Sequence, residues 1–255
     1  MKFNMPFFKK SILLIVFSVS IFSFIGFSDH TYSGKTCQKV IFHIDYQYDN
    51  YFVNEEDVMD LMTLEGREPI EGIAYDKIDL KKLESRILAH KFVKDAQVYK
   101  DVKGNLMVEV QQDRPVARII QTHGPHAYVS NEGGTLPFSP KFTARVILVD
   151  GDYIYTLLKP DFFRSDEGMP YLEVLNIIDS DKFWKAQLAQ MTISANGEIT
   201  FTPQVGDEVI EFGLPEQLEE KFKKMKIYYK EILPMKGFQV YSRVKLKYKD
   251  QIICE

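Results

Sequence analysis

Few side chains in this sequence are spaced so that they can act together in a reaction. His123 and His126 stand three residues apart, a spacing at which two imidazoles can share a metal ion, but no third ligand with supporting spacing stands nearby. His43 and Asp45 fall on the same face of a predicted strand. An acid–base pair needs a pocket, so a surface role is the commoner interpretation of such a pair.

Two segments contain closely spaced aspartates, residues 150–152 (DGD) and 179–181 (DSD). Each lacks the longer series of oxygen ligands of a calcium site, so both are predicted to be turns. Cys37 and Cys254 are the only cysteines, which makes no disulfide framework and predicts two unpaired thiols. The glycine-rich phosphate loops and serine-nucleophile motifs of common enzymes are also missing. The sequence therefore predicts no catalytic residue, no metal site, no cofactor and no small-molecule substrate.

The elements that carry these side chains fall into two parts. In the first, a strand at residues 40–46 precedes a helix opened by Asn54 and Asp57, a second helix capped by Asp79, and strands at residues 93–99 and 106–110. This β-α-α-β-β order predicts an α+β unit in which two helices cover one face of a three-stranded sheet. A junction is expected at residues 113–115, because a proline cannot donate to a strand ladder and restrains the residue before it.

The second part is predicted to be β-rich. Strands are expected at residues 117–121, 126–129, 145–149, 191–194, 198–202 and 208–212. Two amphipathic helices interrupt them, one over about 169–178 and one that begins at Pro215 and ends before Pro234. The second helix carries lysines at 221, 223, 224, 226 and 230, with glutamates four positions before two of them. This pattern predicts a solvated helix face.

The last predicted strand, residues 244–253, is the segment most typical of a working surface. Val244, Leu246 and Tyr248 share one face, and lysines at 245, 247 and 249 share the other. Lysines along an edge strand discourage unwanted pairing, and a protected edge can still receive one chosen partner by strand addition. The pattern alone leaves both interpretations open, a plain terminal strand and an interaction edge.

Residues 11–28 contain no charged side chain and are mostly Ile, Leu, Val and Phe. A helix of this length spans about 27 Å, close to the hydrocarbon thickness of a bilayer. Three lysines precede the segment within residues 1–10, whereas only Asp29 and His30 follow it closely, so the positive-inside rule places the N-terminus in the cytoplasm. A cleaved signal peptide is the rival interpretation. The net charge of −4 does not favour binding to nucleic acid.

Three stretches resemble the FtsQ/DivIB family of bacterial cell-division proteins: FVKDAQVYKDVKGNLMVEVQQDRPVARI (92–119), YVSNEGGTLPFSPKFTARVILVDG (128–151) and VKLKYKDQIIC (244–254). The last two are most similar to versions from the Bacteroidota. The resemblance covers nearly the whole chain and implies a cytoplasmic tail at 1–10, a transmembrane helix at 11–28, a POTRA domain at 38–113 and a β domain at 114–255. The implied fold class is α+β.

The resemblance also implies a function. Such a protein is a non-catalytic, single-pass scaffold of the cell inner membrane, with its C-terminal domain in the periplasm, that binds FtsB-like and FtsL-like single-pass proteins at the division septum. The family's terminal strand region receives FtsB, and the matching residues here are Val244, Leu246, Lys247, Tyr248, Gln251 and Ile252. Lys245 stands where an acidic or amide residue is common, and Lys247 replaces the frequent arginine, so side-chain contacts with the partner are expected to differ.

Two other classes of protein remain as alternatives. A POTRA-bearing periplasmic chaperone or export component would hold extended chains by the same strand addition. An envelope enzyme would need a site that no motif reveals, and the loop with His123 and His126 is where such a site would be sought first.

Overall fold

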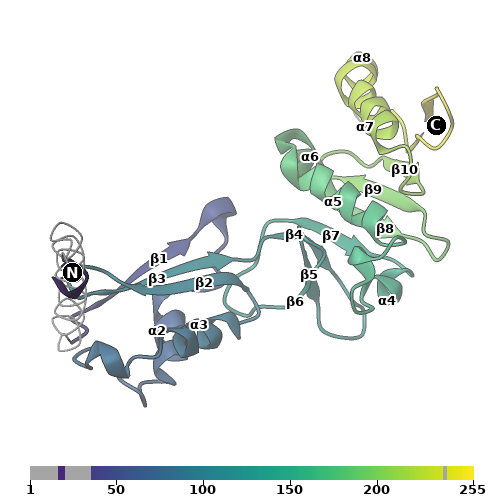
Figure 1. Ribbon diagram of the computed structural model, residues 1–255. Coiled ribbons are helices and arrows are strands. Elements are labelled where there is room, and N and C mark those ends of the chain that lie inside the picture. Colours follow the sequence, from purple (N-terminus) through teal and green to yellow (C-terminus); the bar gives the residue numbers. More distant parts are fainter. Residues whose placement is uncertain (1–16, 21–35, 238–239) are drawn as a thin grey trace, which may run out of the picture. The chain divides into compact units, whose positions relative to one another are not determined.

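The chain folds into two units that do not follow one another simply along the sequence. The computed structural model describes residues 17–20, 36–237 and 240–255 (Figure 1). One unit comprises Met1–Asp45 and Val53–Gln112, and the other comprises Tyr46–Phe52 and Asp113–Glu255. The predicted membrane helix over residues 11–28 lies, apart from 17–20, outside the described residues. Within the part of the chain that is described, no helix is long and apolar enough to cross a membrane.

The two helices of the first unit begin where their capping residues stand. Asn54 and Asp57 form a reciprocal capping box at the start of α2 (Glu55–Thr63), in which the Asp57 N–H donates to Asn54 Oδ1 over 2.9 Å. The side chain of Asp79 accepts from the Lys82 N–H at the start of α3 (Leu80–Leu88). Both predicted helices are confirmed. They start at the predicted residues because a polar side chain there accepts a hydrogen bond from an otherwise unpaired N–H of the first turn.

The sheet of the first unit has the strand order β1-β3-β2. Its members are β1 (Val40–Asp45), β2 (Val93–Lys100) and β3 (Leu106–Gln112). β3 pairs parallel with β1 and antiparallel with β2. The helices cover one face of this sheet (Figure 1), where Val108 and Val110 of β3 are buried together with Val58 of α2 and Ile87 of α3. This is the predicted POTRA-like arrangement, and the other face of the sheet stays polar.

The second unit is built on one mixed sheet of nine strands. Their order is β12-β11-β10-β9-β8-β7-β4-β5-β6. The strands are β4 (Pro115–Ile119), β5 (Ala127–Ser130), β6 (Thr135–Pro137), β7 (Ile147–Asp150), β8 (Leu188–Ile193), β9 (Ile199–Pro203), β10 (Val209–Gly213), β11 (Arg243–Lys245) and β12 (Ile253–Cys254). The β-rich character expected of this part of the chain is thus present.

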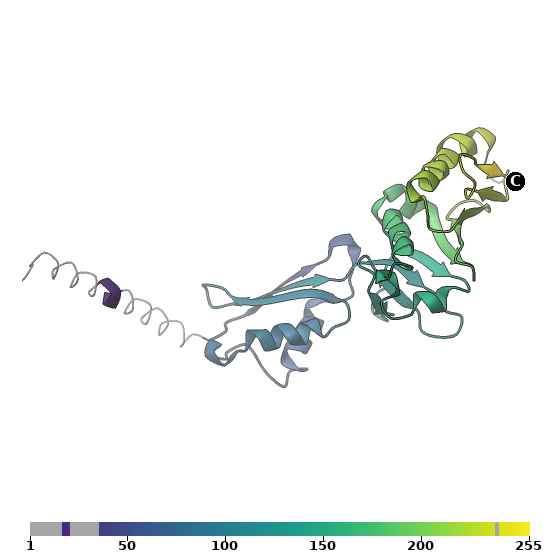
Figure 2. The same ribbon diagram turned by 45° about the vertical axis from the view of Figure 1, so that its right-hand side comes forward.

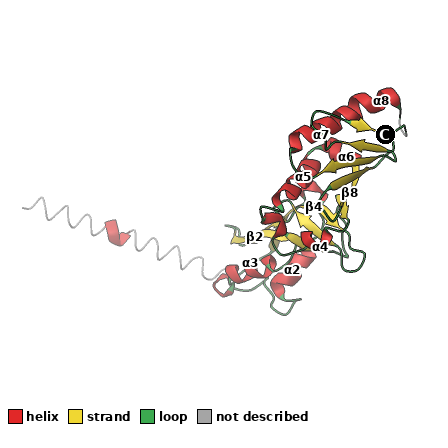
Figure 3. Cartoon of the chain, turned by 90° about the vertical axis from the view of Figure 1, so that its right-hand side faces the viewer, coloured by secondary structure: helices red, strands yellow, loops and turns green. Residues whose placement is uncertain are grey.

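The helices of the second unit lie in the connections between parallel strands. Between β7 and β8 stand α4 (Ile154–Leu157), α5 (Met169–Ser180) and α6 (Lys182–Gln187). Between β10 and β11 stand α7 (Leu218–Ile227), a π-helical turn (Tyr228–Ile232) and α8 (Leu233–Lys236). A connection between parallel strands has to cross the sheet, so these helices cover its face (Figure 3).

Aromatic side chains join the helices to the sheet in the core of the second unit. The ring of Phe212 lies 5.3 Å from that of Phe201 and 5.2 Å from that of Phe222 on α7. The indole of Trp184 on α6 lies 5.5 Å from the same Phe222. Phe201 on β9 and Phe212 on β10 are fully buried. Truncating such a ring costs about 3–5 kcal/mol of folding stability. This cluster therefore holds α6 and α7 against β9 and β10.

Two expectations about the second amphipathic helix were wrong. The helix begins at Leu218 rather than Pro215, after Gln217 in a left-handed conformation. Pro234 also does not end the helical stretch, because α7 continues through the π-helical turn into α8 and Pro234 falls in the first turn of α8. Of the five apolar positions predicted for this helix, 218, 222, 225 and 229 are buried and 232 is half-buried.

Candidate partner-binding edge

The segment predicted as one strand over residues 244–253 is a β-hairpin. Only Arg243–Lys245 (β11) and Ile253–Cys254 (β12) are strands, and the chain between them turns at residues 248–250. Asp250 takes the left-handed conformation with φ of +55°. β11 is therefore an inner strand, paired parallel with β10, and the edge of the sheet is β12 (Figure 2).

The register of the hairpin fixes which main-chain groups face outward. Glu255 and Arg243 exchange two hydrogen bonds, with the Glu255 N–H donating over 2.9 Å and the Arg243 N–H donating over 3.1 Å. In an antiparallel ladder such pairs alternate with pairs that do not bond each other. Cys254, opposite Val244, thus directs its N–H and C=O away from β11, and so does Ile252 two residues before it. These groups are the free side of the sheet.

The two faces of the hairpin differ in chemistry. Ile252 and Cys254 are half-buried and pack against the hydrophobic core, on the same face as the fully buried Val244. The opposite face is charged: Lys245 Nζ lies 2.6 Å from Glu255 Oε1, and Arg243 pairs with Glu211 of β10. A strand added beyond β12 would continue both faces, so it would place alternate side chains against an apolar and a charged surface.

Helix α7 holds the turn of the hairpin in place. Lys224 Nζ donates to the main-chain oxygen of Tyr248 over 2.8 Å and pairs with Glu220 Oε1 over 2.9 Å. The Asp250 N–H donates to the same Glu220 carboxylate over 3.4 Å. The hydrogen bond from Lys224 is the largest cause that lowers the pKa of Glu220 below its usual value. The turn is therefore attached to the helix by charged hydrogen bonds.

The prediction that the lysines of this helix form a solvated face was wrong for two of them. Lys224 is 8% exposed and Lys221 is 3% exposed. Lys221 Nζ donates to the main-chain oxygen of Leu214 over 2.7 Å, and burial lowers its pKa. Both side chains bury their stems and satisfy carbonyl oxygens at the ends of loops. The predicted pair of Glu220 with Lys224 is confirmed.

The six residues predicted to bind a partner lie in three different environments. Val244 and Leu246 are fully buried in the core. Tyr248, in the turn, is 45% exposed, and Gln251, directly after the turn, is exposed. Lys247 is exposed, with Nζ 3.8 Å from Glu211 Oε2, and Ile252 is half-buried directly before the edge strand β12. Of the six, therefore, Lys247, Tyr248 and Gln251 present exposed side chains, whereas Val244 and Leu246 belong to the core.

The other strand edges carry protection. The edge at the opposite end of the large sheet is β6, a strand of three residues that includes Pro137, which has no N–H to offer. In the first unit, Glu84 accepts from the Val98 N–H of β2 over 2.9 Å, and Glu71 accepts from the Val40 N–H of β1 over 3.3 Å. Among the described residues, no such side chain bonds the outward groups of β12.

The residues first considered for chemistry are not gathered into a centre. His123 is exposed, whereas His126 accepts from the Gln121 N–H through Nδ1 over 3.3 Å and packs against Phe138. His43 and Asp45 lie on the open face of the first sheet, where His43 stands opposite Glu109. Across residues 17–20, 36–237 and 240–255, no three His, Cys, Asp or Glu side chains are grouped so that they could hold a metal ion.

The two aspartate-rich segments have structural contacts of their own. Asp150 accepts from Gln190 over 2.6 Å and from Thr192 over 2.7 Å, and the predicted turn follows it. The second segment is not a turn, because Asp179 lies in the last turn of α5, which ends at Ser180, and Asp181 caps α6. The Phe183 N–H is the largest cause that lowers the pKa of Asp181.

Both cysteines are free thiols, as predicted. Cys37 is buried, and Cys254 is half-buried on the edge strand. Burial raises the pKa of both thiols, so neither is activated as a nucleophile.

Comparison with known families agrees with this architecture. The family model described as FtsQ/DivIB, C-terminal related, matches residues 114–255, which is more than half of the chain. A model for the POTRA-like domain matches residues 35–111. No curated protein sequence matches the chain. The chain therefore belongs to the FtsQ/DivIB family of bacterial cell-division proteins.

Proposed function

We propose that this protein is a non-catalytic scaffold of the division septum that binds FtsB-like and FtsL-like single-pass proteins, with an FtsB-like segment added as a strand to β12. The observation that carries the proposal is the open edge. Ile252 and Cys254 direct main-chain donors and acceptors outward beside the exposed Tyr248 and Gln251. Main-chain bonds of this kind supply affinity, and neighbouring side-chain surfaces supply selectivity.

The apolar segment over residues 11–28 supports an anchored form of the scaffold. In this proposal it spans the inner membrane, residues 1–10 are cytoplasmic, and both folded units are periplasmic. Its partners are anchored in the same membrane. Confinement to one membrane raises their effective concentration, which suits contacts made along a short strand edge.

The test uses the full-length protein and its FtsB-like partner, copurified from the membrane. Cys254→Pro removes the outward N–H of the edge strand and leaves the bonds of Glu255 to Arg243 intact, whereas Cys254→Ala keeps that N–H. We expect Cys254→Pro to reduce recovery of the partner at least tenfold and Cys254→Ala to change it little. Equal recovery with both variants would sink the edge assignment.

A second pair of variants tests the side-chain contribution. Tyr248→Glu places a charge on the exposed ring position, and Tyr248→Phe keeps the ring. We expect only Tyr248→Glu to weaken partner binding. Fluorescence of Trp184, the single tryptophan, verifies that each variant is folded. A fluorescent fusion that gathers at midcell is expected, and a uniform envelope signal would instead favour a chaperone or export component.

A further inference from the structure

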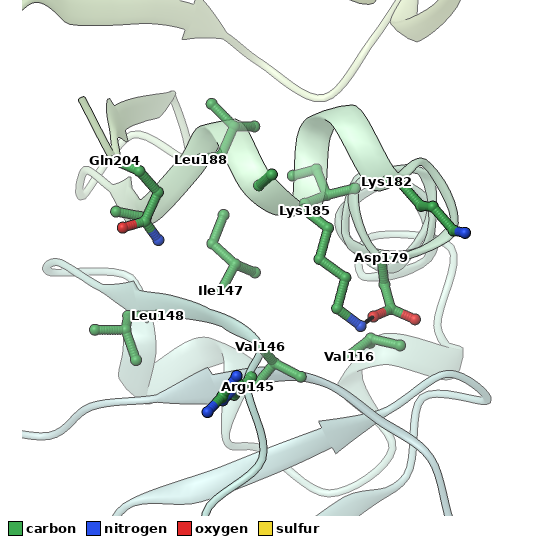
Figure 4. Close-up of a pocket in the computed structure, with 13 residues that line it drawn as sticks. Val116, Arg145, Val146, Ile147, Leu148, Asp179, Lys182, Lys185, Leu188 and Gln204 are labelled. Atoms are coloured by element: carbon green, nitrogen blue, oxygen red, sulfur yellow. Dashed lines mark hydrogen bonds and ion pairs between the residues drawn. The ribbon is translucent and has the colours of Figure 1, made fainter. Parts of the chain in front are cut away.

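A groove opens in the second unit where two neighbouring strands separate. The parallel ladder of β7 and β8 begins only at Leu148 and Gln190, because a bulge between Leu188 and Gln190 redirects the start of β8. The opening has a volume of about 690 Å³ and lies between the beginning of β7 and helix α6 (Figure 4). It is separate from the β12 edge in the strand order.

The floor of the groove is apolar. Val116, Ile147, Ile178 and Leu188 line it and are each at most 6% exposed. Ile147 and Leu188 point toward one another across the opening (Figure 4). Ala186 and Ala189 complete the wall with side chains too small to fill it. The groove therefore has room for one or two aliphatic side chains, and burial of each would remove apolar surface from water.

The rim of the groove is positively charged. Arg145 and Lys182 are exposed and, within the described residues, have no carboxylate partner. Lys185 Nζ lies 2.6 Å from Asp179, the only acidic residue of the lining, and Arg114 also pairs with that carboxylate. Because Asp179 is buried and already doubly paired, it does not neutralise the rim. A basic rim on a chain of net charge −4 selects an acidic ligand.

The main chain at the mouth favours an extended ligand. The Ile120 N–H donates to the Val149 oxygen over 2.8 Å, so Val149 turns its main-chain groups toward β4. Alternate residues of a parallel strand face opposite neighbours. Val146 directly precedes β7, and continuation of this alternation would turn its N–H and C=O toward β8, at the level where β8 has moved away.

We propose that this groove binds a second segment of a partner protein, an extended stretch in which leucine-like side chains alternate with aspartate or glutamate. The aliphatic side chains would enter between Ile147 and Leu188, and the carboxylates would meet Arg145 and Lys182. The site does not depend on strand addition at β12. It gives the scaffold a second contact of different chemistry. A partner that occupies both contacts at once binds with a higher overall affinity than either contact provides alone.

The test uses the full-length protein in detergent and a fluorescent six-residue peptide, Glu-Leu-Glu-Leu-Glu-Leu, with binding followed by polarisation. The double variant Arg145→Glu, Lys182→Glu is expected to weaken this peptide at least tenfold and to gain binding of Lys-Leu-Lys-Leu-Lys-Leu. Lys159→Glu, Lys249→Glu is the matched control, with the same charge change at residues outside the groove lining. The variant Cys254→Pro is expected to bind the acidic peptide like the wild type, which separates this site from the β12 edge.

Two outcomes would overturn the proposal. Equal binding of the acidic peptide to the groove variant and its control would show that the rim does not select it. A second control peptide carries serine in place of each leucine. If it binds as well as the acidic leucine peptide, and millimolar inorganic phosphate displaces it, the groove is a general anion site and not a peptide groove. Binding of anionic lipid vesicles but not of the peptide would count against it in the same way.

Discussion

The ammonium group of Lys224 on α7 donates a hydrogen bond to the main-chain oxygen of Tyr248 over 2.8 Å. The bond connects the helix layer to the turn of the edge hairpin, and Glu220 reinforces it from the same helix. The proposed partner edge is thus positioned by the buried Lys224 together with the half-buried Glu220. Hydrogen bonds that involve a charged group are among the stronger ones in proteins.

Replacing Lys224 with methionine is expected to loosen the hairpin. The substitution keeps the apolar stem but removes the donor, and loss of a hydrogen bond with a charged partner costs about 1.5–3 kcal/mol. Urea unfolding monitored by Trp184 fluorescence measures the change, and hydrogen exchange locates it at β11 and β12. Lys223→Met, at an exposed position of the same helix, is the control and should change the free energy of unfolding little.

Gly151 is expected to tolerate no side chain. Its φ is +105°, and a Cβ built there would stand 2.2 Å from the main-chain oxygen of Ile193. Gly151→Ala should therefore cost at least about 2 kcal/mol, because it adds both backbone strain and a clash. Gly66→Ala shares the positive φ but meets nothing within 4 Å, so it isolates the strain. Equal losses for the two variants would contradict the clash.

Phe52 is expected to stabilise the second unit, although most of that unit lies more than sixty residues later in the chain. Its ring lies 5.5 Å from Tyr128 and 4.9 Å from Phe142, and it is 2% exposed. Phe52→Ala should destabilise the second unit by about 3–5 kcal/mol, as expected for a buried ring. The readout is the thermal unfolding midpoint from Trp184 fluorescence. Phe52→Leu, which keeps most of the apolar volume, should shift that midpoint less.

Stability is expected to fall in acid but to change little around neutral pH. Hydrogen bonds and ion pairs lower the pKa of Asp181 below 3.8 and the pKa values of Glu220 and Glu255 below 4.5. A carboxyl whose pKa is lowered by folding stabilises the protein above its unfolded value, and that contribution is lost as pH falls through the folded value. The urea midpoint should therefore decline below about pH 4.5. Asp181→Asn keeps a capping oxygen without the titration, so its decline should be shallower.

Stability is also expected to fall at high pH, where tyrosine side chains ionise. The hydrogen bond with Glu167 is the largest cause that raises the pKa of Tyr153 to about 12, and burial is the largest cause that raises that of Tyr75 to about 12. These tyrosines stay protonated in the folded state at a pH where the unfolded chain ionises near 10. Stability should consequently fall between about pH 10 and 12. Tyr153→Phe is expected to lessen that fall.

The sequence predicted the first unit well because its signals are local. The caps at Asn54 and Asp79 depend on residues three positions away, and the alternation in β2 and β3 depends on one buried face. The short elements β6, α4 and α6 were missed. They hold three to six residues each, too few to establish a period.

The candidate site was harder to predict than the fold around it. Alternation over residues 244–253 indicated one strand, but the break at the turn depends on Glu220 and Lys224, which come from a helix more than twenty residues earlier. The bond to Tyr248 accounts for the buried Lys224, and a separate bond to the Leu214 oxygen accounts for the buried Lys221. Neighbouring positions in the sequence could not distinguish Val244 and Leu246, which lie in the core, from Tyr248, which is exposed.

The seven residues Tyr46–Phe52 also bear on how this protein can be recombined with its relatives. They are encoded between β1 and α2 of the POTRA-like unit, yet they belong to the other unit, where Tyr48 stacks on Arg114 and Tyr51 lies 5.6 Å from Phe142. A chimera joined only at residue 114 would combine the β domain of one protein with the residue 46–52 segment of the other. Exchange of the β domain as a working module therefore needs two crossovers, one for this short insert and one at the junction.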